Sequence, residues 1–559
     1  MRQSGSVRPL GWSLVCLGCV FAGLLALTLA ESRPAVAGGV PEASPPGGTE
    51  IPITAAEVDA AVRAAAAAVA GEGLAVAVVD RTGAVLAVFR RAGATAADQE
   101  LALSLARTAA FFGENAAPLT SRTVRFISGI HFPPGVTNQE NADLYGIENT
   151  NRVSRGVTFN PGRAYPDPLN IDGTGPSLGI TTGKVQPMDA NPRAVNPGGV
   201  PLYRQDFLRG FPDLSPTSFA PLGITQIGGI GVAGVPPDAA EFAAVQGSKA
   251  GEQPVPTQGA RIGQDTIQQI APRPKTVYIA GISLPLSNPR NFRRPRGVAP
   301  GGPFPGTGAY RVGPVGGTSA PDGFLAGPVG NADLTAAEVV QIIRQCDDIA
   351  KRTRAAIRLP LGARARFVFA VGGLGGEMLA VFRQVDSTIF SIDVAVAKAR
   401  NVVFFSNPAL DPTILSDRSG PGFPDRAEGL PPGTAVTARS ISFAAQPLFP
   451  AGINVSRRPG PFFQLFLDDL AFPGSTSPRL PQPNIMTNGI LFFPGSIPLY
   501  RNGRLIGGLG VSGDGVAQDD FVTFNGAQGF LPPPNIRSDN FTIRSVRIPF
   551  LKFPRNPTL

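Results

Sequence analysis

The sequence predicts an α+β fold in two tandem copies, each an antiparallel sheet flanked by helices. Short sequence blocks recur in the same order, and within each series helical patterns alternate with strand-like ones. The block TAAEV at 54–58 returns at 335–339, and LAVFR at 86–90 returns at 379–383. Because the order is kept while the spacings differ, each half is predicted to be a complete fold with long loops. Short solenoid repeats are excluded, since they would recur every few tens of residues.

The first half opens with a helix, a hairpin and a second helix. Thr54 is a suitable N-cap, and Glu57 completes a capping box in front of an alanine-rich run, which favours a helix. The apolar runs 74–79 and 84–89 are separated by Asp-Arg-Thr-Gly, which predicts a β-hairpin. Helical periodicity returns over 97–112.

The second half repeats this order. Thr335 and Glu338 form the same capping signature. Strands are predicted around 367–371 and 378–382, and a helix from about 389 to 403.

A closing hairpin ends each half. In the second half IPLY at 497–500 is followed by the turn Arg-Asn-Gly-Arg and then by LIGGLGVSG at 505–513. The Asn-Gly pair favours a tight hairpin turn. The first half keeps PLYR at 201–204 and GGIGVAG at 228–234 but has a different turn between them.

Composition shifts divide the chain into five segments. Stretches dense in proline and glycine separate the repeated blocks and favour a linker between the halves. The predicted segments are a signal peptide at 1–37, a flexible leader at 38–49, a first domain at 50–292, a linker at 293–332 and a second domain at 333–559.

The first residues are typical of an export signal. Two arginines precede an apolar run over 10–30, and Ala-Val-Ala at 35–37 is a small-residue cleavage site. The mature protein is expected to start near Gly38, to carry no transmembrane segment and to be periplasmic or extracellular. An uncleaved membrane anchor is the alternative, because the run nearly reaches spanning length. Cys19 lies inside the apolar run, which disfavours a lipoprotein.

Composition excludes several classes of partner and site. The formal charge is +9, and the basic residues are dispersed apart from RNFRRPR at 290–296, so no nucleic acid is expected as a partner. The mature chain has a single cysteine, Cys346, which follows apolar residues at helical spacing and is expected to be buried. With one histidine, a Cys/His metal site is excluded, although carboxylate sites stay open.

Catalytic side chains are scarce. The chain has no Gly-x-Ser-x-Gly elbow, and we therefore expect a protein that is not an enzyme. Paired aspartates occur at 347–348, 468–469 and 519–520. We interpret them as parts of solvated faces, because adjacent residues on a helix point in different directions.

Both closing hairpins contain G-x-G-x-x-G, at 229–234 and at 508–513. A dinucleotide fingerprint should instead open a βαβ unit, so this function is disfavoured. The alternative is a strand whose glycines allow close approach by a helix or by a flat ligand, with Gly231 and Gly510 at its centre.

Three blocks together carry a family resemblance. They are AVVDRTGAVLAVFR at 77–90, SIDVAVAKAR at 391–400 and PLYRNGRLIGGLGVSG at 498–513. As a set they resemble the GlcG/HbpS-like haem-binding family. The resemblance implies an antiparallel sheet flanked by helices, assembly into oligomers or pairing of the two halves within the chain, and binding of haem or a related tetrapyrrole.

The resemblance also suggests ligand-binding residues on the family helix. Haem requires an apolar slot, basic groups for its propionates and an axial ligand. Arg107 and Arg400 occupy the same helix position in the two halves. When the two helices are aligned, Lys398 lies opposite Leu105, so the family lysine is present in the second half alone. The two halves are therefore not expected to bind identical ligands.

Three further residues complete the candidate site. His131 is the only imidazole, and its counterpart in the second half is Leu448. It is a candidate axial metal ligand for haem, or else a structural residue next to a proline-rich turn. Arg122 and Arg439 occupy matching places before what we predict to be apolar strands. They are candidates to pair with propionates or to fix a nearby loop.

The function predicted from the sequence is non-catalytic binding of haem or a similar flat ligand outside the cytoplasm. A different class stays open: a structural or interaction protein that keeps the fold without a ligand pocket and uses its long loops for contact. An enzyme of tetrapyrrole or small-acid metabolism is least favoured.

Overall fold

The structure is a computed structural model of the 559-residue chain. Residues 41–559 belong to one unit. The residues that it describes are 53–114, 119–122, 124, 156–160, 164–179, 197–205, 224–249, 276–279, 282–285, 294–302, 308–312, 320–356, 358, 363–418, 428–446, 449–450, 458–472, 477–492 and 494–559.

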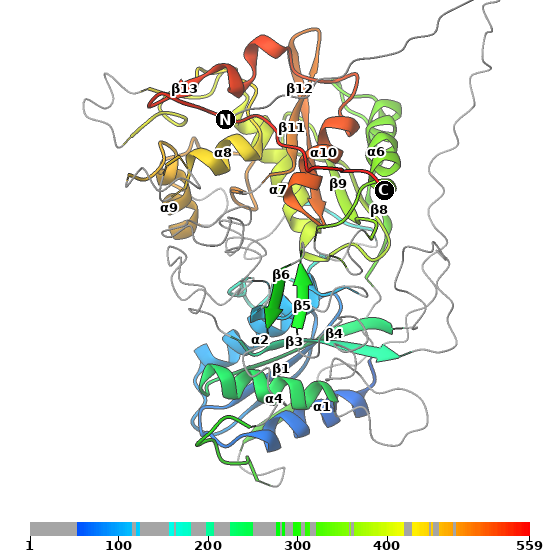
Figure 1. The fold of residues 1–559 in the computed structure, drawn as a ribbon, viewed down its shortest axis with the longest axis vertical. Coiled ribbons are helices and arrows are strands. Elements are labelled where there is room, and N and C mark those ends of the chain that lie inside the picture. The colour runs from blue at the N-terminus through cyan, green and yellow to red at the C-terminus, as the bar shows by residue number, and fades with distance from the viewer. Residues whose placement is uncertain are drawn as a thin grey trace, which may run out of the picture. The chain divides into compact units, whose positions relative to one another are not determined.

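Each half contains a five-stranded antiparallel sheet, so the predicted fold class is confirmed (Figure 1). Four strands have the same order in the two sheets, whereas one edge strand comes last along the chain in the first half and first in the second. The first sheet has the order β3-β4-β1-β2-β7 and the second β11-β12-β9-β10-β8. The strands of the first are β1 (Ala75–Asp80), β2 (Val85–Arg90), β3 (Gly199–Gln205), β4 (Ile224–Ala233) and β7 (Ala309–Val312). Those of the second are β8 (Gly323–Ala326), β9 (Phe367–Gly372), β10 (Met378–Arg383), β11 (Ser496–Arg501) and β12 (Arg504–Gly513).

The register of the central strands shows which residues are equivalent. Ala77 pairs with Gly231 between β1 and β4, and Ala370 pairs with Gly510 between β9 and β12. The repeated blocks of the sequence therefore occupy the same places in the two sheets.

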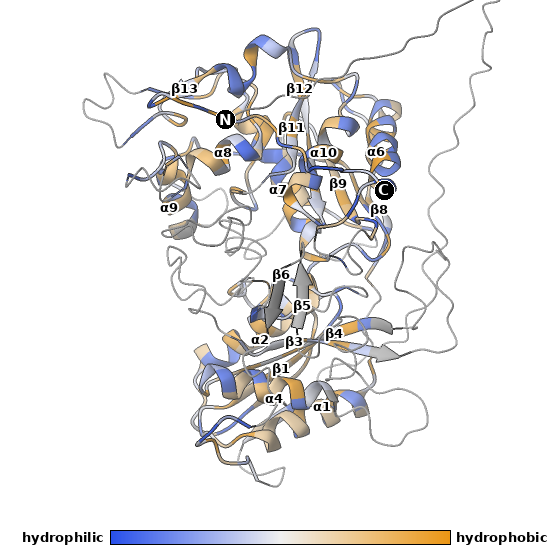
Figure 2. Ribbon diagram, viewed as in Figure 1, coloured by the Kyte–Doolittle hydropathy of each residue, from blue (hydrophilic) through white to orange (hydrophobic). Residues whose placement is uncertain are grey.

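Helices cover both faces of each sheet. One face carries α2 (Ala96–Phe112) or α7 (Phe390–Phe405). The other carries α1 (Ala55–Ala68) with α4 (Pro237–Lys249), or α6 (Ala336–Ala350) with α10 (Val516–Gly526). Hydrophobic residues run along α1 and α4 with hydrophilic ones between them, as expected for helices with one buried side (Figure 2).

The central strands are buried on both faces, so they are almost continuously apolar. In β1, Ala77 and Val79 pack in the cluster of α2, whereas Val76 and Val78 pack in the cluster of α1 and α4. This division follows from the alternation of side chains along a strand.

The predicted capping boxes start the first helix of each half. Thr54 Oγ1 accepts a hydrogen bond from the backbone of Glu57, whose carboxylate accepts one from the Thr54 backbone. Thr335 and Glu338 make the same exchange at α6. These bonds satisfy amide groups that the first turn of a helix leaves unpaired.

The segment 293–332, predicted to be a linker, also supplies an edge strand to each sheet. Strand β7 pairs with β2, and β8 pairs with β10. Both strands have four residues. Their signal is weak in the sequence because the segment is dense in proline and glycine, which short edge strands tolerate.

Residues 437–444 correct a second expectation. Arg439 does not precede a strand but lies in α8 (Ala438–Ala444), which Thr437 and Ser440 begin with a capping box. The part of the second half between β10 and β11 also contains α9 (Phe463–Ala471), which packs with α8 in a separate apolar cluster.

Short elements complete the described part of the chain. They are the hairpin of β5 (Thr276–Ile279) and β6 (Ile282–Pro285), the 3-10 turns η5 (Pro534–Ile536) and η6 (Ser538–Asn540), and the hairpin of β13 (Thr542–Ile543) and β14 (Val546–Arg547).

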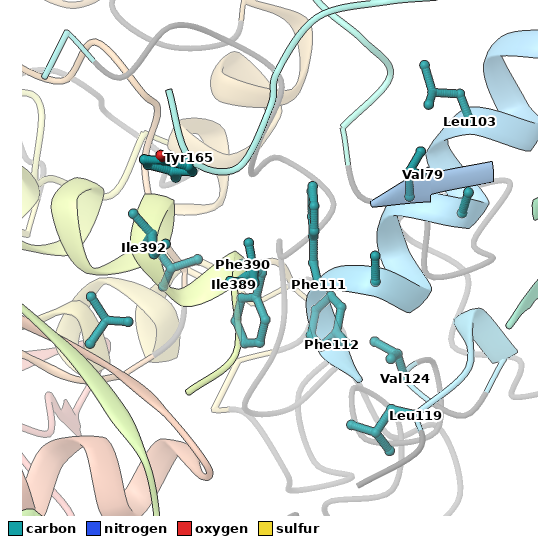
Figure 3. Close-up of a cluster of buried hydrophobic side chains, with 14 of the residues drawn as sticks. Val79, Leu103, Phe111, Phe112, Leu119, Val124, Tyr165, Ile389, Phe390 and Ile392 are labelled. Carbon is teal, nitrogen blue, oxygen red and sulfur yellow. The ribbon is translucent and has the colours of Figure 1, made fainter. Parts of the chain in front are cut away.

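An apolar cluster includes the helices α2 and α7 and thereby joins the two halves (Figure 3). The rings of Phe112 and Phe390 stack with their centroids 4.1 Å apart. Tyr165, from a loop of the first half, belongs to the same cluster, as does Ile392. The pairing of halves within one chain, which the sequence left open, is therefore visible in this core.

Candidate functional site

Arg107 and Arg400, the predicted ligand-binding arginines, anchor equivalent hairpin turns. Arg107 Nε donates to the carbonyl of Gly83 at 2.8 Å, and Arg400 Nε donates to the carbonyl of Gly376, also at 2.8 Å. Both glycines have positive φ values, 90° and 79°, which a residue with a side chain rarely adopts. The two arginines thus fix the β1–β2 and β9–β10 turns against α2 and α7.

The remaining groups of Arg107 hold a loop of the first half. Its Nη1 donates to the carbonyl of Leu169, and its Nη2 lies 3.5 Å from Asp167 Oδ2. The side chain is 1% exposed, so the hairpin and this loop enclose the guanidinium.

Arg400 holds loops from both halves. Its Nη1 donates to Thr487 Oγ1 at 2.8 Å and to Asn488 Oδ1 at 3.0 Å. Its Nη2 donates to the carbonyl of Gly156, in the first half, at 3.2 Å. Burial lowers the pKa of Arg400 to about 10, and the negative charge of Asp393 opposes this shift. Both predicted arginines are therefore engaged with protein groups.

Gly231 and Gly510 allow close packing of a helix on the sheet. A Cβ at Gly231 would overlap the carbonyl oxygen of Ala102 in α2, and one at Gly510 would overlap that of Ala395 in α7. Of the two partners considered for these glycines, the helix is the one in contact. Their contact with a ligand stays a prediction, and it requires the helix to move.

Lys398 forms a buried ion pair that the sequence did not predict. Its Nζ lies 2.9 Å from Asp519 Oδ2 in α10 and donates to the carbonyl of Val511 at 2.7 Å. Burial raises the pKa of Asp519 to about 7 and lowers the pKa of Lys398, because both charged forms are removed from water. Asp519 Oδ1 has no hydrogen-bond partner among the described residues.

The first half has apolar residues at the equivalent places. A Cβ on Gly198 would lie 3.4 Å from Leu105 Cδ1 and 3.2 Å from Ala240 Cβ. A Cβ on Gly495 would instead lie near Lys398 Nζ and Asp519 Cβ. The ion pair of the second half thus stands where the first half has a leucine and an alanine.

A second buried pair lies next to the first. Arg439 Nε binds Asp520 Oδ2, while Gly495 N donates to Asp520 Oδ1 at 2.9 Å and Lys552 N donates to Oδ2 at 3.0 Å. Burial raises the pKa of Asp520, although Arg439 acts in the opposite direction. The paired aspartates 519–520 are therefore buried, which corrects their interpretation as a solvated face.

The first half has an arginine and an acid that interact electrostatically at the equivalent places. Burial lowers the pKa of Arg122, and the carboxylate of Glu241 acts against the shift. Glu241 is 2% exposed and follows Ala240 as Asp520 follows Asp519. Arg439 thus binds an acid on the closing helix of its own half, and the charge of Arg122 interacts with the equivalent acid of the first half.

Two of the sequence predictions have different outcomes. His131 lies outside the described residues, so its role as a ligand stays a prediction. Cys346 is buried in α6, as expected, and burial raises the pKa of its thiol.

The acids Asp519 and Asp520 were missed because nothing in an Asp-Asp pair distinguishes a buried position from a solvated one.

A cavity of about 210 Å³ lies beside β2 and the loop that Arg107 holds. It is lined by Val85, Val88, Leu169, Ile171 and Arg311, among others. Sites for drug-sized ligands usually measure about 300–1,000 Å³. In the arrangement seen here, the described residues of the predicted site do not form a slot of haem size, since the arginines bind protein groups and helices cover the glycines.

Neither a metal-binding cluster nor a membrane-spanning helix occurs among the described residues. Within them, no group of three or more His, Cys, Asp or Glu residues is arranged to hold a metal ion. None of the helices described is both long and apolar enough to cross a membrane.

Comparison with known families decides the relationship. The sequence model of the HbpS-like family, described as haem degrading protein HbpS-like, matches residues 53–210 and 344–528. The chain belongs to the HbpS-like family. The two matches fall in the two halves, which confirms the resemblance seen in the sequence. Among curated proteins, no significant match was found.

Two solved structures match about a third of this chain each. A structure described as a PduOC:heme complex has 19% identity and a TM-score of 0.20, covering 36% of this chain and 96% of its own. The protein ORFY of Klebsiella pneumoniae, from the family DUF336, has 18% identity and a TM-score of 0.22, covering 36% and 95%.

Proposed function

We propose that this HbpS-like protein binds haem or a related flat tetrapyrrole outside the cytoplasm. The observation that carries the proposal is the match of the family in both halves, each of which keeps the whole five-stranded sheet. The family model is described as haem degrading. Because catalytic side chains are few in this chain, we propose binding of haem and not its degradation.

The first half is the proposed place of iron coordination. His131 lies within the first matched region and is the only histidine of the chain. An imidazole is a common axial ligand of haem iron. We propose His131 for this role and the second half for a different ligand or for none, because Leu448 stands at the matching position.

Export is part of the proposal. It rests on the apolar run followed by Ala35-Val36-Ala37, which is typical of a cleaved signal peptide. The protein would then meet its ligand in the periplasm or outside the cell.

One observation favours a second candidate function, that of an interaction module without a ligand. The predicted cations Arg107, Arg400 and Lys398 all bind groups of the protein itself. A chain that used the fold for contact alone would need no other arrangement.

Haemin titration of the mature chain separates the two functions. Binding predicts a saturable Soret band at a fixed stoichiometry, and His131→Ala is expected to shift or abolish it. Cys346→Ala serves as the control, because the buried thiol in α6 should have no part in coordination. The same sample followed over time with a reductant distinguishes a stable complex from haem degradation.

Each outcome has a distinct meaning. A saturable band that is unchanged in His131→Ala rejects the axial role and keeps haem binding. The absence of any saturable change in the folded wild-type chain rejects haem binding and favours the interaction module.

A further inference from the structure

The two halves meet at one end of each equivalent helix. The C-terminal end of α2 contacts the N-terminal end of α7, where the rings of Phe112 and Phe390 stack (Figure 3). The backbone amide of Ile389 donates to the carbonyl of Phe111 at 3.1 Å. All four side chains are buried, so the contact excludes water.

A buried ion-pair cluster lies at the same junction. Glu114, two residues after α2, lies 2.7 Å from Arg358 Nη2 of the second half. Arg358 also binds Asp386 and Asp514, both from the second half. The first half thus contributes one carboxylate to a site that the second half otherwise builds.

The contact joins two different surfaces. Phe404 and Phe405, at the end of α7, are the counterparts of Phe111 and Phe112 at the end of α2. At the start of α2, by contrast, alanines stand where α7 has Ile389 and Phe390. The junction is therefore heterologous, and each half also carries an unused surface equivalent to the one that the other half presents. Heterologous contacts continue into open filaments unless the free surfaces are blocked.

One unused surface, the C-terminal end of α7, is covered by its own half. Phe405 is 1% exposed and packs in the apolar cluster of α8 and α9, and Phe404 packs against that cluster. Asn407, which is exposed, stands where the first half has Glu114. This end offers neither free rings nor the carboxylate.

The other unused surface, the N-terminal end of α2, lacks the binding groups. Ala96 and Ala97 are exposed at the positions of Ile389 and Phe390. Gly93 and Val235 stand where the second half has Asp386 and Asp514. A second copy would find alanines in place of the Ile389 and Phe390 anchor, and no acid at the positions equivalent to Asp386 and Asp514.

We propose that the α2–α7 junction is a head-to-tail docking surface whose one partner is the other half of the same chain. The insertion with α8 and α9 blocks one outer end, and the small residues at the start of α2 block the other. The mature protein is then a closed, monomeric pair of domains whose halves unfold together.

The experiment uses the full mature chain and the double variant Ile389→Ala/Phe390→Ala. This variant installs the residues with which the first half forms its own helix α2, so α7 should still form. The mature chain lacks tryptophan, because the single Trp12 lies in the signal peptide. Urea unfolding is therefore followed by circular dichroism, with amide exchange measured by mass spectrometry and mass by light scattering.

The wild type should have the mass of a monomer at all concentrations and unfold in one transition. The variant should unfold in two transitions, and amide exchange at the C-terminal end of α2 should be at least about tenfold faster. As the matched control, Ile342→Ala/Ile343→Ala removes two buried side chains from α6, away from the junction. It should lower the midpoint but keep one transition.

Two results would overturn the proposal. One is a wild type that unfolds in two separate transitions, of which the junction variant shifts only one. The other is a wild type whose mass rises with protein concentration, together with a lower mass in a variant altered in α2. If the double variant does not fold, Glu114→Asn provides the test with the residue of the second half. Unchanged exchange at Phe111–Gly113 in that variant would reject the junction.

Discussion

Leu105 and Lys398 occupy the same place on equivalent helices, yet one lies in an apolar core and the other binds a carboxylate. Leu105 lies near Gly198, whereas Lys398 lies near Gly495 and forms an ion pair with Asp519. The two halves thus have equivalent backbone folds, but the second half buries two charged groups at this place. The free energy of unfolding of the two halves should therefore respond differently to substitutions at this place.

Removing one partner of the ion pair should be strongly destabilising. Lys398→Leu leaves Asp519 buried without its cation, and it should lower the free energy of unfolding by about 3–5 kcal/mol. Adding Asp519→Ala gives the residue pair of the first half, and most of that loss should be recovered, to within about 2 kcal/mol of wild type. Urea unfolding followed by circular dichroism provides the measurement.

An exposed pair provides the control for this cycle. Arg63 and Asp59 lie one helical turn apart in α1 with a separation of 2.6 Å, and both are partly exposed to water. Asp59→Asn should change the free energy of unfolding by about 0.5 kcal/mol or less. A double variant no more stable than Lys398→Leu would show that the two side chains are not coupled.

The stability of the chain should depend on the protonation of Glu114. Burial raises the pKa of Glu114 well above its usual value, the cation of Arg358 opposes this, and Asp514 adds to it. Between the usual pKa of a glutamate and the raised one, the folded chain therefore binds more of this proton than the unfolded chain does. The free energy of unfolding should then be highest below the usual pKa of a glutamate and fall as the pH rises through the raised pKa.

Glu114→Gln isolates this effect, since the amide is neutral at every pH. The charged and titratable groups around Glu114 are Arg358, Asp514, Asp386, Tyr203 and Arg81, and all are kept in the variant. Urea unfolding from about pH 4 to pH 8 should show a smaller decline in Glu114→Gln than in wild type. Parallel curves would contradict a raised pKa in the folded state.

Two glycine substitutions should differ because of what lies near each glycine. Gly503 has a φ of 77° in the Asn-Gly turn, with no atom within 4 Å of an added Cβ, so Gly503→Ala should cost about 1–2 kcal/mol of strain. Gly510→Ala places a methyl group on the backbone of α7, with Ala399 N only 2.7 Å away. It should cost about 3 kcal/mol or more. Equal losses in urea unfolding would mean that α7 moves away easily.

The export proposal predicts the mass of the exported protein. Cleavage after Ala37 should give a chain that starts near Gly38, as measured by intact mass spectrometry of the secreted or periplasmic fraction. A substitution of Ala37 by a bulky residue such as Phe should slow cleavage and leave the longer chain. Recovery of the full-length wild type in the membrane fraction would support the anchor instead.

Local signals in the sequence were sufficient for the regular elements. The capping box of Thr54 and Glu57, and the Asn-Gly turn at Asn502, are determined by neighbouring residues. The recurrence of blocks then predicted equivalent sheets. Arg439 was misplaced because α8 has only seven residues, too few for a helical period to be recognised.

The groups that bind the predicted site residues depend on contacts distant in sequence. Lys398 and Asp519 lie on different helices, and Arg400 meets Gly156 from the other half. The family resemblance selected Lys398 and Arg400 as ligand-binding residues, and that role stays a prediction; their protein partners were left open. Burial decided the partners, because a buried cation has to find a carbonyl or a carboxylate.

The short strands β7 and β8 affect how the protein can be synthesised and divided. A gene fragment that ends at residue 292 would encode a first sheet without β7, and one that starts at 333 would lack β8. Either product would expose the edge of β2 or β10 to pairing with other chains. During synthesis, the first sheet can be completed only when residue 312 has left the ribosome. Its last strand therefore becomes available just before the second half is made.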